Sequence, residues 1–280
     1  MYAVALFIVV GTFAGARGAR VETVRIPFEG IAGRGYTTVV LPDAYDTSQD
    51  RYPVVYFLHG YGGNHRSWLA HPGFTDLADT HECLLVCASP GPATWYRDSP
   101  RRSRSQAATY VAVAVVGHID SLYRTRTSPG ARVLAGSSMG GHGALMLMTD
   151  YPHLFGAAVA ISAPMELVSA GNRWGLRAVF GSSRQGTRVR REHSFLYRIG
   201  ELDSTTGMIR LDCGTSDWAL ESNRAAGMLL ERHGIPHVRE EHPGGHTPAY
   251  VSAALPRQMA AIAAFFRKEA LEEEERAPGE

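Results

Sequence analysis

The chain has 280 residues, 45% of them hydrophobic, and a formal net charge of +1. This is enough apolar material for one sizeable core, so the simplest organisation is a single globular domain. A net charge so close to zero gives no electrostatic argument for a nucleic-acid partner, and we expect none.

Strand and helix patterns alternate along most of the chain. Two β-rich segments at 21–27 and 37–41 flank a turn with glycine, which predicts an antiparallel pair. The wholly apolar segment 54–58 is typical of a strand buried on both faces. The other expected strands are 84–88, 133–135, 157–162, 208–213 and 237–241, and the expected helices lie near 73–81, 106–123, 139–150, 223–233 and 256–275. This alternation predicts an α/β fold, a three-layer sandwich around a mostly parallel eight-stranded sheet.

Three segments fall outside this alternation. Residues 1–16 are apolar and end in small residues, which is typical of a signal peptide and too short for a membrane span. On that interpretation the protein is secreted or periplasmic; if the segment is a buried strand or follows a mis-assigned start, the protein is cytoplasmic. Residues 165–206, rich in Gly, Ser and Arg, predict an irregular lid or pocket excursion. We therefore expect one domain over 17–270 and a charged tail at 271–280.

A candidate nucleophile lies at 136–140, where the chain reads Gly-Ser-Ser-Met-Gly. A short strand-like segment precedes this G-x-S-x-G pattern, and a helix that opens on small residues follows it. This is the context of a nucleophile elbow, in which Ser138 projects from a tight turn above a sheet. A side chain at either flanking glycine would collide with the neighbouring strand or helix.

Candidates for an acid and a base follow in chain order. Asp217 lies in the loop after the strand 208–213, and His246 follows a Pro/Gly turn after 237–241. The order Ser138, Asp217, His246 is that of α/β-hydrolases, and all three residues lie past carboxyl ends of strands, where open α/β sheets place their sites. His246 would act as the base, and Asp217 would hold its imidazole in the correct tautomer.

Each of these residues also has a purely structural interpretation. A serine at a helix start is often an N-cap, and an aspartate in a loop often forms an Asx-turn. Two nearby residues compete for the triad: Asp212 lies inside its strand and has less freedom to reach the base, and His242 precedes the turn. The ordered combination therefore favours Asp217 and His246.

Donors for an oxyanion are expected from two backbone segments. The glycine-rich segment 59–63 follows the third strand, and Met139 starts the helix after the nucleophile, so the N–H groups of Tyr61 and Met139 are the candidates. The glycine-rich segment lacks the ending of a P-loop and the dinucleotide fingerprint. We expect neither a cofactor nor a metal. The side chains expected in the substrate pocket are those of His59, Trp95, Tyr96, His142 and Trp174.

The sequence resembles the putative-esterase family of α/β-hydrolases over about residues 22–268. The matching segments are 56–64 (Tyr-Phe-Leu-His-Gly-Tyr-Gly-Gly-Asn), 95–100 (Trp-Tyr-Arg-Asp-Ser-Pro), 135–144 (Ala-Gly-Ser-Ser-Met-Gly-Gly-His-Gly-Ala), 150–156 (Asp-Tyr-Pro-His-Leu-Phe-Gly), 212–217 (Asp-Cys-Gly-Thr-Ser-Asp) and 243–246 (Pro-Gly-Gly-His). The family includes esterase D (S-formylglutathione hydrolase), tributyrin esterases, feruloyl and acetylxylan esterases, and mycolyltransferases. The resemblance implies an α/β-hydrolase fold and the same triad and oxyanion donors. Pro248 departs from the family pattern, in which an aromatic residue is common.

The leading hypothesis is a serine carboxylesterase that hydrolyses a small-molecule, sugar or phenolic acyl ester through a covalent acyl-enzyme. The alternatives are an acyltransferase that uses the same intermediate and a non-catalytic binding protein on the same fold. Arginines follow the expected fourth strand, at 97, 101, 102 and 104, and others occur at 184, 188, 190 and 191. They are either solvated loop residues or recognise a carboxylate or phosphate of the substrate.

Overall fold

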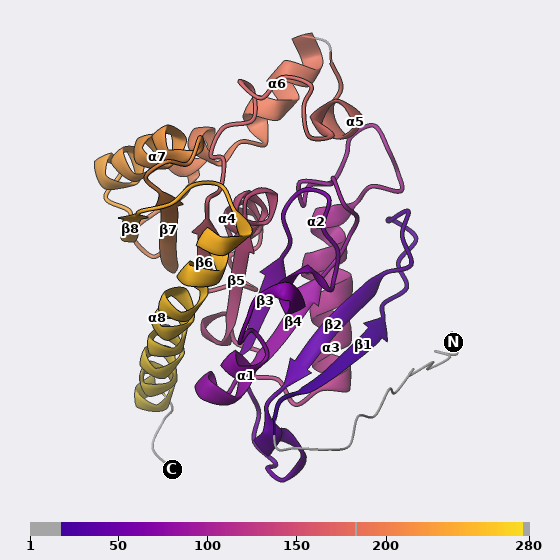
Figure 1. The fold of residues 1–280 in the computed structure, drawn as a ribbon, viewed down its shortest axis with the longest axis vertical. Coiled ribbons are helices and arrows are strands. Elements are labelled where there is room, and N and C mark those ends of the chain that lie inside the picture. The colour runs from indigo at the N-terminus through magenta and orange to yellow at the C-terminus, as the bar shows by residue number, and fades with distance from the viewer. Residues whose placement is uncertain (1–17, 183, 277–280) are drawn as a thin grey trace.

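A computed structural model describes residues 18–182 and 184–276 of the protein, and a central sheet organises this part of the chain (Figure 1). The strand order is β1-β2-β4-β3-β5-β6-β7-β8. β1 and β2 pair antiparallel, as do β2 and β4, and every other pair is parallel. The strands are β1 Arg20–Arg25, β2 Tyr36–Leu41, β3 Val54–Leu58, β4 Leu84–Ala88, β5 Arg132–Ser137, β6 Ala157–Ile161, β7 Met208–Gly214 and β8 His237–His242. The predicted mostly parallel eight-stranded sheet is confirmed.

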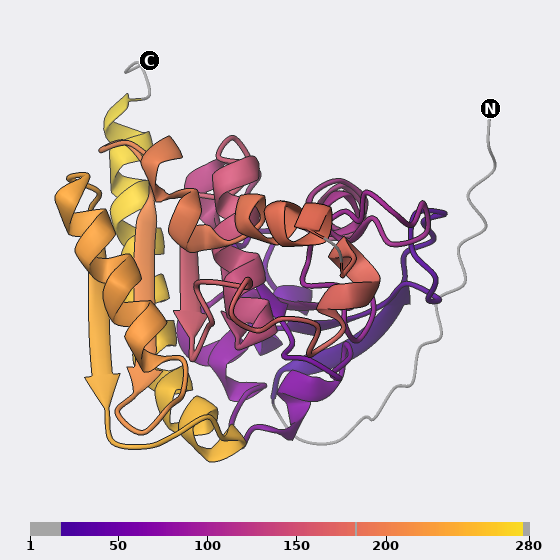
Figure 2. The same cartoon turned by 90° about the horizontal axis from the view of Figure 1, so that it is seen from above.

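Helices cover both faces of the sheet, as the view from above shows (Figure 2). On one face, side chains such as Tyr56 and Leu134 pack with the segments that contain α2, α3, α4 and α7; on the other, Val55 and Val133 pack with α1 and α8. Successive side chains of β3 and β5 point to opposite faces of the sheet, and helices bury both faces. This burial explains the apolar runs in the two strands. The helices are α1 Asp76–His81, α2 Ala107–Thr109, α3 Val116–Leu122, α4 Met139–Asp150, α5 Leu176–Phe180, α6 Arg184–Glu192, α7 Leu220–Arg232 and α8 Pro248–Arg276.

Two helices differ from the sequence prediction. The helix expected near 106–123 contains a π-helical segment, Tyr110–Val115, between α2 and α3. α8 begins at Pro248, eight residues before the expected start, and continues through Pro256. Proline is favoured at the first position of a helix, where its nitrogen needs no hydrogen-bond partner, and usually breaks a helix elsewhere. The expected start at Pro256 was therefore wrong, because Pro248 is the proline that begins α8. α8 also takes in the first part of the expected tail, up to Arg276.

The excursion at 165–206 is not irregular, contrary to the sequence prediction. It contains α5, α6 and two short 3₁₀ segments, Phe195–Tyr197 and Ile199–Glu201. Its apolar side chains are widely spaced in the sequence, yet several of them, including Leu176 and Phe180, are buried in the core cluster that contains α4. The apolar residues of this segment show no helical periodicity, so the sequence pattern did not predict that they contribute to the core.

The expected signal peptide at 1–16 lies outside the described residues, so export stays a prediction. Among residues 18–182 and 184–276, no helix is both long and apolar enough to cross a membrane.

Candidate active site

The backbone around Ser138 has the strained geometry of a nucleophile elbow. β5 ends at Ser137, α4 begins at Met139, and Ser138 between them has φ 53° and ψ −119°. Few side chains adopt a positive φ, and such strain persists only where the surroundings over-determine it. The Ser138 N–H donates to the Ile161 carbonyl at 2.8 Å, and the Ser138 carbonyl accepts from the His142 N–H at 3.1 Å. These hydrogen bonds fix the turn from β6 and from α4.

The two glycines that flank the elbow have the steric role expected of them. A Cβ on Gly140 would collide with the Leu58 carbonyl at the end of β3, and one on Gly136 would collide with the backbone of Gly140. Helix α4 therefore approaches the carboxyl ends of β3 and β5 more closely than any residue with a side chain would allow. This close approach places Ser138 above the centre of the sheet.

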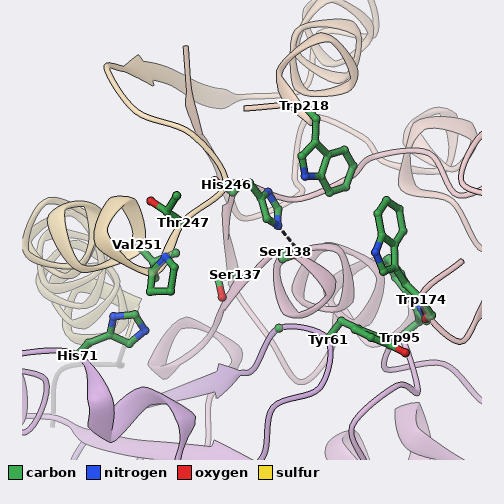
Figure 3. A pocket seen from close by; sticks show the side chains of 13 residues that line it. Tyr61, His71, Trp95, Ser137, Ser138, Trp174, Trp218, His246, Thr247 and Val251 are labelled. Carbon is green, nitrogen blue, oxygen red and sulfur yellow. Dashed lines mark hydrogen bonds between the residues drawn. The ribbon is translucent and has the colours of Figure 1, made fainter. Parts of the chain in front are cut away.

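Ser138, His246 and Asp217 form a continuous hydrogen-bonded chain. His246 Nε2 lies 2.9 Å from Ser138 Oγ, and His246 Nδ1 lies 3.0 Å from each carboxylate oxygen of Asp217. The Asp217 side chain is wholly buried, whereas 27% of the His246 side chain is exposed. Figure 3 shows the imidazole of His246 between Ser138 and Trp218. Loops that are 79 and 108 residues from Ser138 along the chain thus meet it at one edge of the sheet.

The ionised form of Asp217 is favoured by its hydrogen bonds. Burial alone would raise the pKa of this carboxyl group, but hydrogen bonds from His246 and from the Ala219 N–H, at 2.8 Å, lower the pKa below its ordinary value. A carboxylate that stays ionised can stabilise an adjacent imidazolium and hold the other ring nitrogen toward Ser138.

The competing carboxylate, Asp212, is engaged elsewhere. It accepts hydrogen bonds from the Tyr250 hydroxyl, from Arg257 Nη2 at 3.0 Å and from Gln258 Nε2 at 2.8 Å. These partners belong to α8, so Asp212 ties β7 to that helix. The structure brings Asp217, and not Asp212, to His246.

A group of potential metal ligands, found among the described residues, lies beside this anchor. Donor atoms of Asp212, Glu240 and His242 lie within 4.8 Å of one another. Arg257 contacts the first carboxylate, and Arg210 contacts the second at 2.8 Å. These guanidinium groups already supply the positive charge that a metal ion would bring, so this group fits a network of ion pairs better than a metal site.

The two predicted oxyanion donors, the backbone N–H groups of Tyr61 and Met139, belong to segments next to Ser138. Tyr61 follows Gly60, whose Cβ position would lie 3.8 Å from Ser138 Cβ, and Met139 is the first residue of α4. The loop is held by the Gly62 N–H, which donates to the Pro92 carbonyl at 2.7 Å, and by the Tyr96 hydroxyl, which donates to the His59 carbonyl at 3.2 Å. Within the part of the chain that the structure describes, no acceptor is found for the N–H groups of Tyr61 and Met139. Both donors remain available to a ligand.

A cavity of about 380 Å³ opens beside Ser138 and His246. Trp95 and Trp174 line it, as the sequence predicted. Trp218 lines it as well, although 52% of this residue is exposed. Its ring stacks on Trp174 with centroids 5.0 Å apart and lies 4.8 Å from the His246 ring (Figure 3).

Sequence reasoning missed several of the lining residues. Trp218 directly follows the predicted acid, and this adjacency was a usable signal. No sequence signal pointed to His71, which lies before α1. Its position in the cavity wall depends on a 2.7 Å hydrogen bond between its Nδ1 and Ser252 Oγ in α8. Thr247 and Pro248, directly after the predicted base, also line the cavity.

Three residues expected in the pocket do not line it. His59, Tyr96 and His142 are buried beneath the site, with at most 1% of each exposed. Tyr96 packs against Gly143 of α4 and donates from its hydroxyl to the His59 carbonyl at 3.2 Å. Burial lowers the pKa of His59 to about 4 and that of His142 to about 3. For these three residues, nearness to the motifs in sequence was not sufficient, because their side chains point into the core beneath the loops.

The family model "Putative esterase" matches residues 32–262. The chain belongs to this family, and the expected α/β-hydrolase fold agrees with the architecture described above.

Individual proteins show the same relationship. The chain is 30% identical over 243 residues to an esterase of Mycobacterium tuberculosis strain H37Rv, an alignment that covers 74% of this chain and 51% of that protein. It thus spans about half the length of that relative. It is 24% identical to an acetyl esterase of Caldicellulosiruptor saccharolyticus, over 72% of this chain and 79% of the relative. Among solved structures, a ferulic acid esterase superposes with a TM-score of 0.78 at 22% identity, over 90% of this chain and all of that one.

Proposed function

We propose that the protein is a serine carboxylesterase that hydrolyses small acyl esters through a covalent acyl-enzyme. The observation that carries this proposal is the hydrogen-bonded chain from Asp217 through His246 to Ser138, which ends at an open cavity. Membership of the esterase family supports the same activity.

The first half of the proposed reaction forms the acyl-enzyme. Ser138 Oγ attacks the ester carbonyl carbon while His246 Nε2 takes the hydroxyl proton. The carbonyl oxygen becomes an oxyanion and accepts hydrogen bonds from the N–H groups of Tyr61 and Met139. The tetrahedral intermediate then collapses, its C–O bond to the alcohol breaks, and the imidazolium gives its proton to the leaving oxygen.

The second half releases the acid. A water molecule loses a proton to His246 Nε2 and attacks the acyl carbon, the same two N–H groups stabilise the oxyanion, and Ser138 leaves with the proton returned by His246. Each oxyanion donor contributes about 3 kcal/mol to the stability of the transition state. Asp217 acts at both stages by stabilising the imidazolium, which its buried and ionised state suits.

The aromatic side chains of the cavity indicate the kind of ester. Trp174 and Trp218 present a stacked pair of rings beside His246, against which a flat phenolic ring or the apolar face of a sugar can pack. The names of the relatives, a ferulic acid esterase and an acetyl esterase, accord with such substrates. We therefore propose a phenolic or sugar acyl ester as the substrate class.

Labelling by a fluorophosphonate probe tests the proposal. The probe should form one adduct per chain, and peptide mass spectrometry should place it on Ser138. The Ser138→Ala variant should not be labelled, whereas Ser137→Ala, which removes the neighbouring hydroxyl, should react as the wild type does. Absence of labelling in folded wild-type protein that also fails to hydrolyse para-nitrophenyl acetate would overturn the proposal.

A further inference from the structure

A second hollow, of about 410 Å³, is lined by arginines. Arg101 and Arg102 come from the loop after β4, and Arg177 comes from α5. Gly175 lines the second hollow, and the preceding residue, Trp174, lines the active-site cavity. The Cβ position of Gly175 would lie 3.5 Å from Cε2 of the Tyr61 ring, and Tyr61 also lines the active-site cavity.

Among the described residues, the side chains of these three arginines have no partner, unlike those of other arginines nearby. Arg97, in the same loop, is buried and pairs with Asp150, which also binds Arg198 at 3.0 Å. Within residues 18–182 and 184–276, by contrast, no ion pair or side-chain hydrogen bond engages the guanidinium groups of Arg101, Arg102 and Arg177. In the described part of the chain, no acidic side chain lines the hollow either.

The backbone around the hollow is held in place by hydrogen bonds that do not use the arginine side chains. The buried Ser99 hydroxyl donates to the Val179 carbonyl at 2.7 Å and so joins the loop to α5. Gln106 Nε2 donates to the Arg102 carbonyl at 2.9 Å and closes the loop on itself. Arg101 lies along the end of α5, because its Nη1 is 3.2 Å from the Cβ position of Gly181.

The three arginines are exposed and line one hollow, so their positive charges add to a local field that attracts an anion. Guanidinium groups present paired N–H donors that match the oxygens of a carboxylate or a phosphate. We propose that Arg101, Arg102 and Arg177 form a subsite for an anionic group carried by the ester substrate, at the end remote from the scissile bond. This proposal rests on the proposed esterase function and adds a charge preference to it.

Matched ester pairs test the subsite from both sides of the scissile bond. On the acyl side, para-nitrophenyl hydrogen adipate is compared with its neutral methyl ester; on the alcohol side, para-acetoxybenzoate and para-acetoxyphenyl phosphate are compared with methyl para-acetoxybenzoate. In at least one series, kcat/KM for the anion should exceed that for the neutral ester by about tenfold, the scale of a hydrogen bond to a charged group. The phosphate and carboxylate arms identify which anion is preferred.

Arginine variants locate the preference. Arg101→Gln and Arg177→Gln should each reduce the ratio of anionic to neutral kcat/KM, and the double variant should bring it close to one. Arg104→Gln is the matched control, because it removes the same charge from the same exposed loop without lining the hollow. The wild-type preference should also weaken as salt concentration rises.

The possible failures are distinguishable. Hydrolysis of the neutral esters without an anion preference in either series would overturn the subsite and leave the esterase function intact. So would a preference that survives in the double variant or falls equally in Arg104→Gln. A protein that neither hydrolyses the neutral esters nor reacts with the fluorophosphonate would overturn the esterase function itself.

Discussion

The floor and the rim of the active-site cavity are built in different ways. The floor consists of the elbow at Ser138 with the buried His59 and His142 beneath it; the rim consists of Trp174 and Trp218 with the unpaired arginines beyond them. Backbone close approach and complete burial hold the floor, whereas contacts between exposed or half-buried side chains hold the rim. The floor should therefore set the rate for every ester, and the rim should set the choice among esters.

Ser138→Ala should have the largest effect. Without the nucleophile, kcat should fall by about 10⁶-fold for short and bulky esters alike. Circular dichroism and thermal unfolding should show a fold like that of the wild type, because the helix start and the hydrogen bonds of the Ser138 backbone remain. Activity within tenfold of the wild type in pure variant protein would exclude Ser138 as the nucleophile.

Asp217→Asn should come next, with a loss in kcat on the order of 10⁴, because an amide leaves the imidazole in the wrong tautomer. Asp212→Asn is the matched comparison. It should mainly lower the free energy of unfolding, by about 1–3 kcal/mol, because it disturbs the buried contacts with α8. Kinetics and urea denaturation at matched folded fraction would separate the two; the reverse pattern would assign the acid to Asp212.

The buried histidines of the floor should make stability depend on pH. In the unfolded chain a histidine takes up a proton below about pH 6.5, but His142 in the folded protein does not until the pH nears 3. The unfolded state thus binds more protons between these limits, and the free energy of unfolding falls as the pH falls. His142 alone should account for about 2 kcal/mol of that loss by about pH 5.

Urea denaturation at about pH 7 and about pH 5 measures this effect. His142→Leu, which replaces the titratable ring beside Trp95 with an apolar side chain, should show a smaller loss between the two pH values than the wild type. An equal loss in both proteins would mean that His142 does not contribute to the pH dependence.

Trp174→Ala should have the smallest effect on the overall rate and a selective effect on substrate choice. The ratio of kcat/KM between bulky and short acyl esters should change by about tenfold or more, the scale of one pocket contact. The melting temperature should move little, because the ring is only half-buried. Tyr197→Ala is the control, an exposed aromatic residue of the same excursion that does not line the cavity. A uniform loss for all esters with a large drop in melting temperature would show that Trp174 serves the core.

The sequence by itself determined the strands, the elbow and the order of the triad candidates. These features are local or follow from a general rule of the fold. The wholly apolar runs favoured strands buried on both faces, and the glycines around Ser138 favoured a close approach of helix and strand. The carboxyl ends of parallel strands lie at one edge of the sheet. This rule alone predicted that Asp217 and His246 lie near Ser138, before any tertiary contact was known.

Only the tertiary structure decided which side chains face the cavity and which arginines have partners. His142 lies one helical turn from Ser138 but points into the core, and Trp218 enters the cavity from a loop far along the chain. Arg97 and Arg101 lie four positions apart in one loop, yet among the described residues only Arg97 pairs with an acid, Asp150 at the end of α4. Burial and ion pairing depend on segments distant in sequence, and no local pattern records which of them will meet.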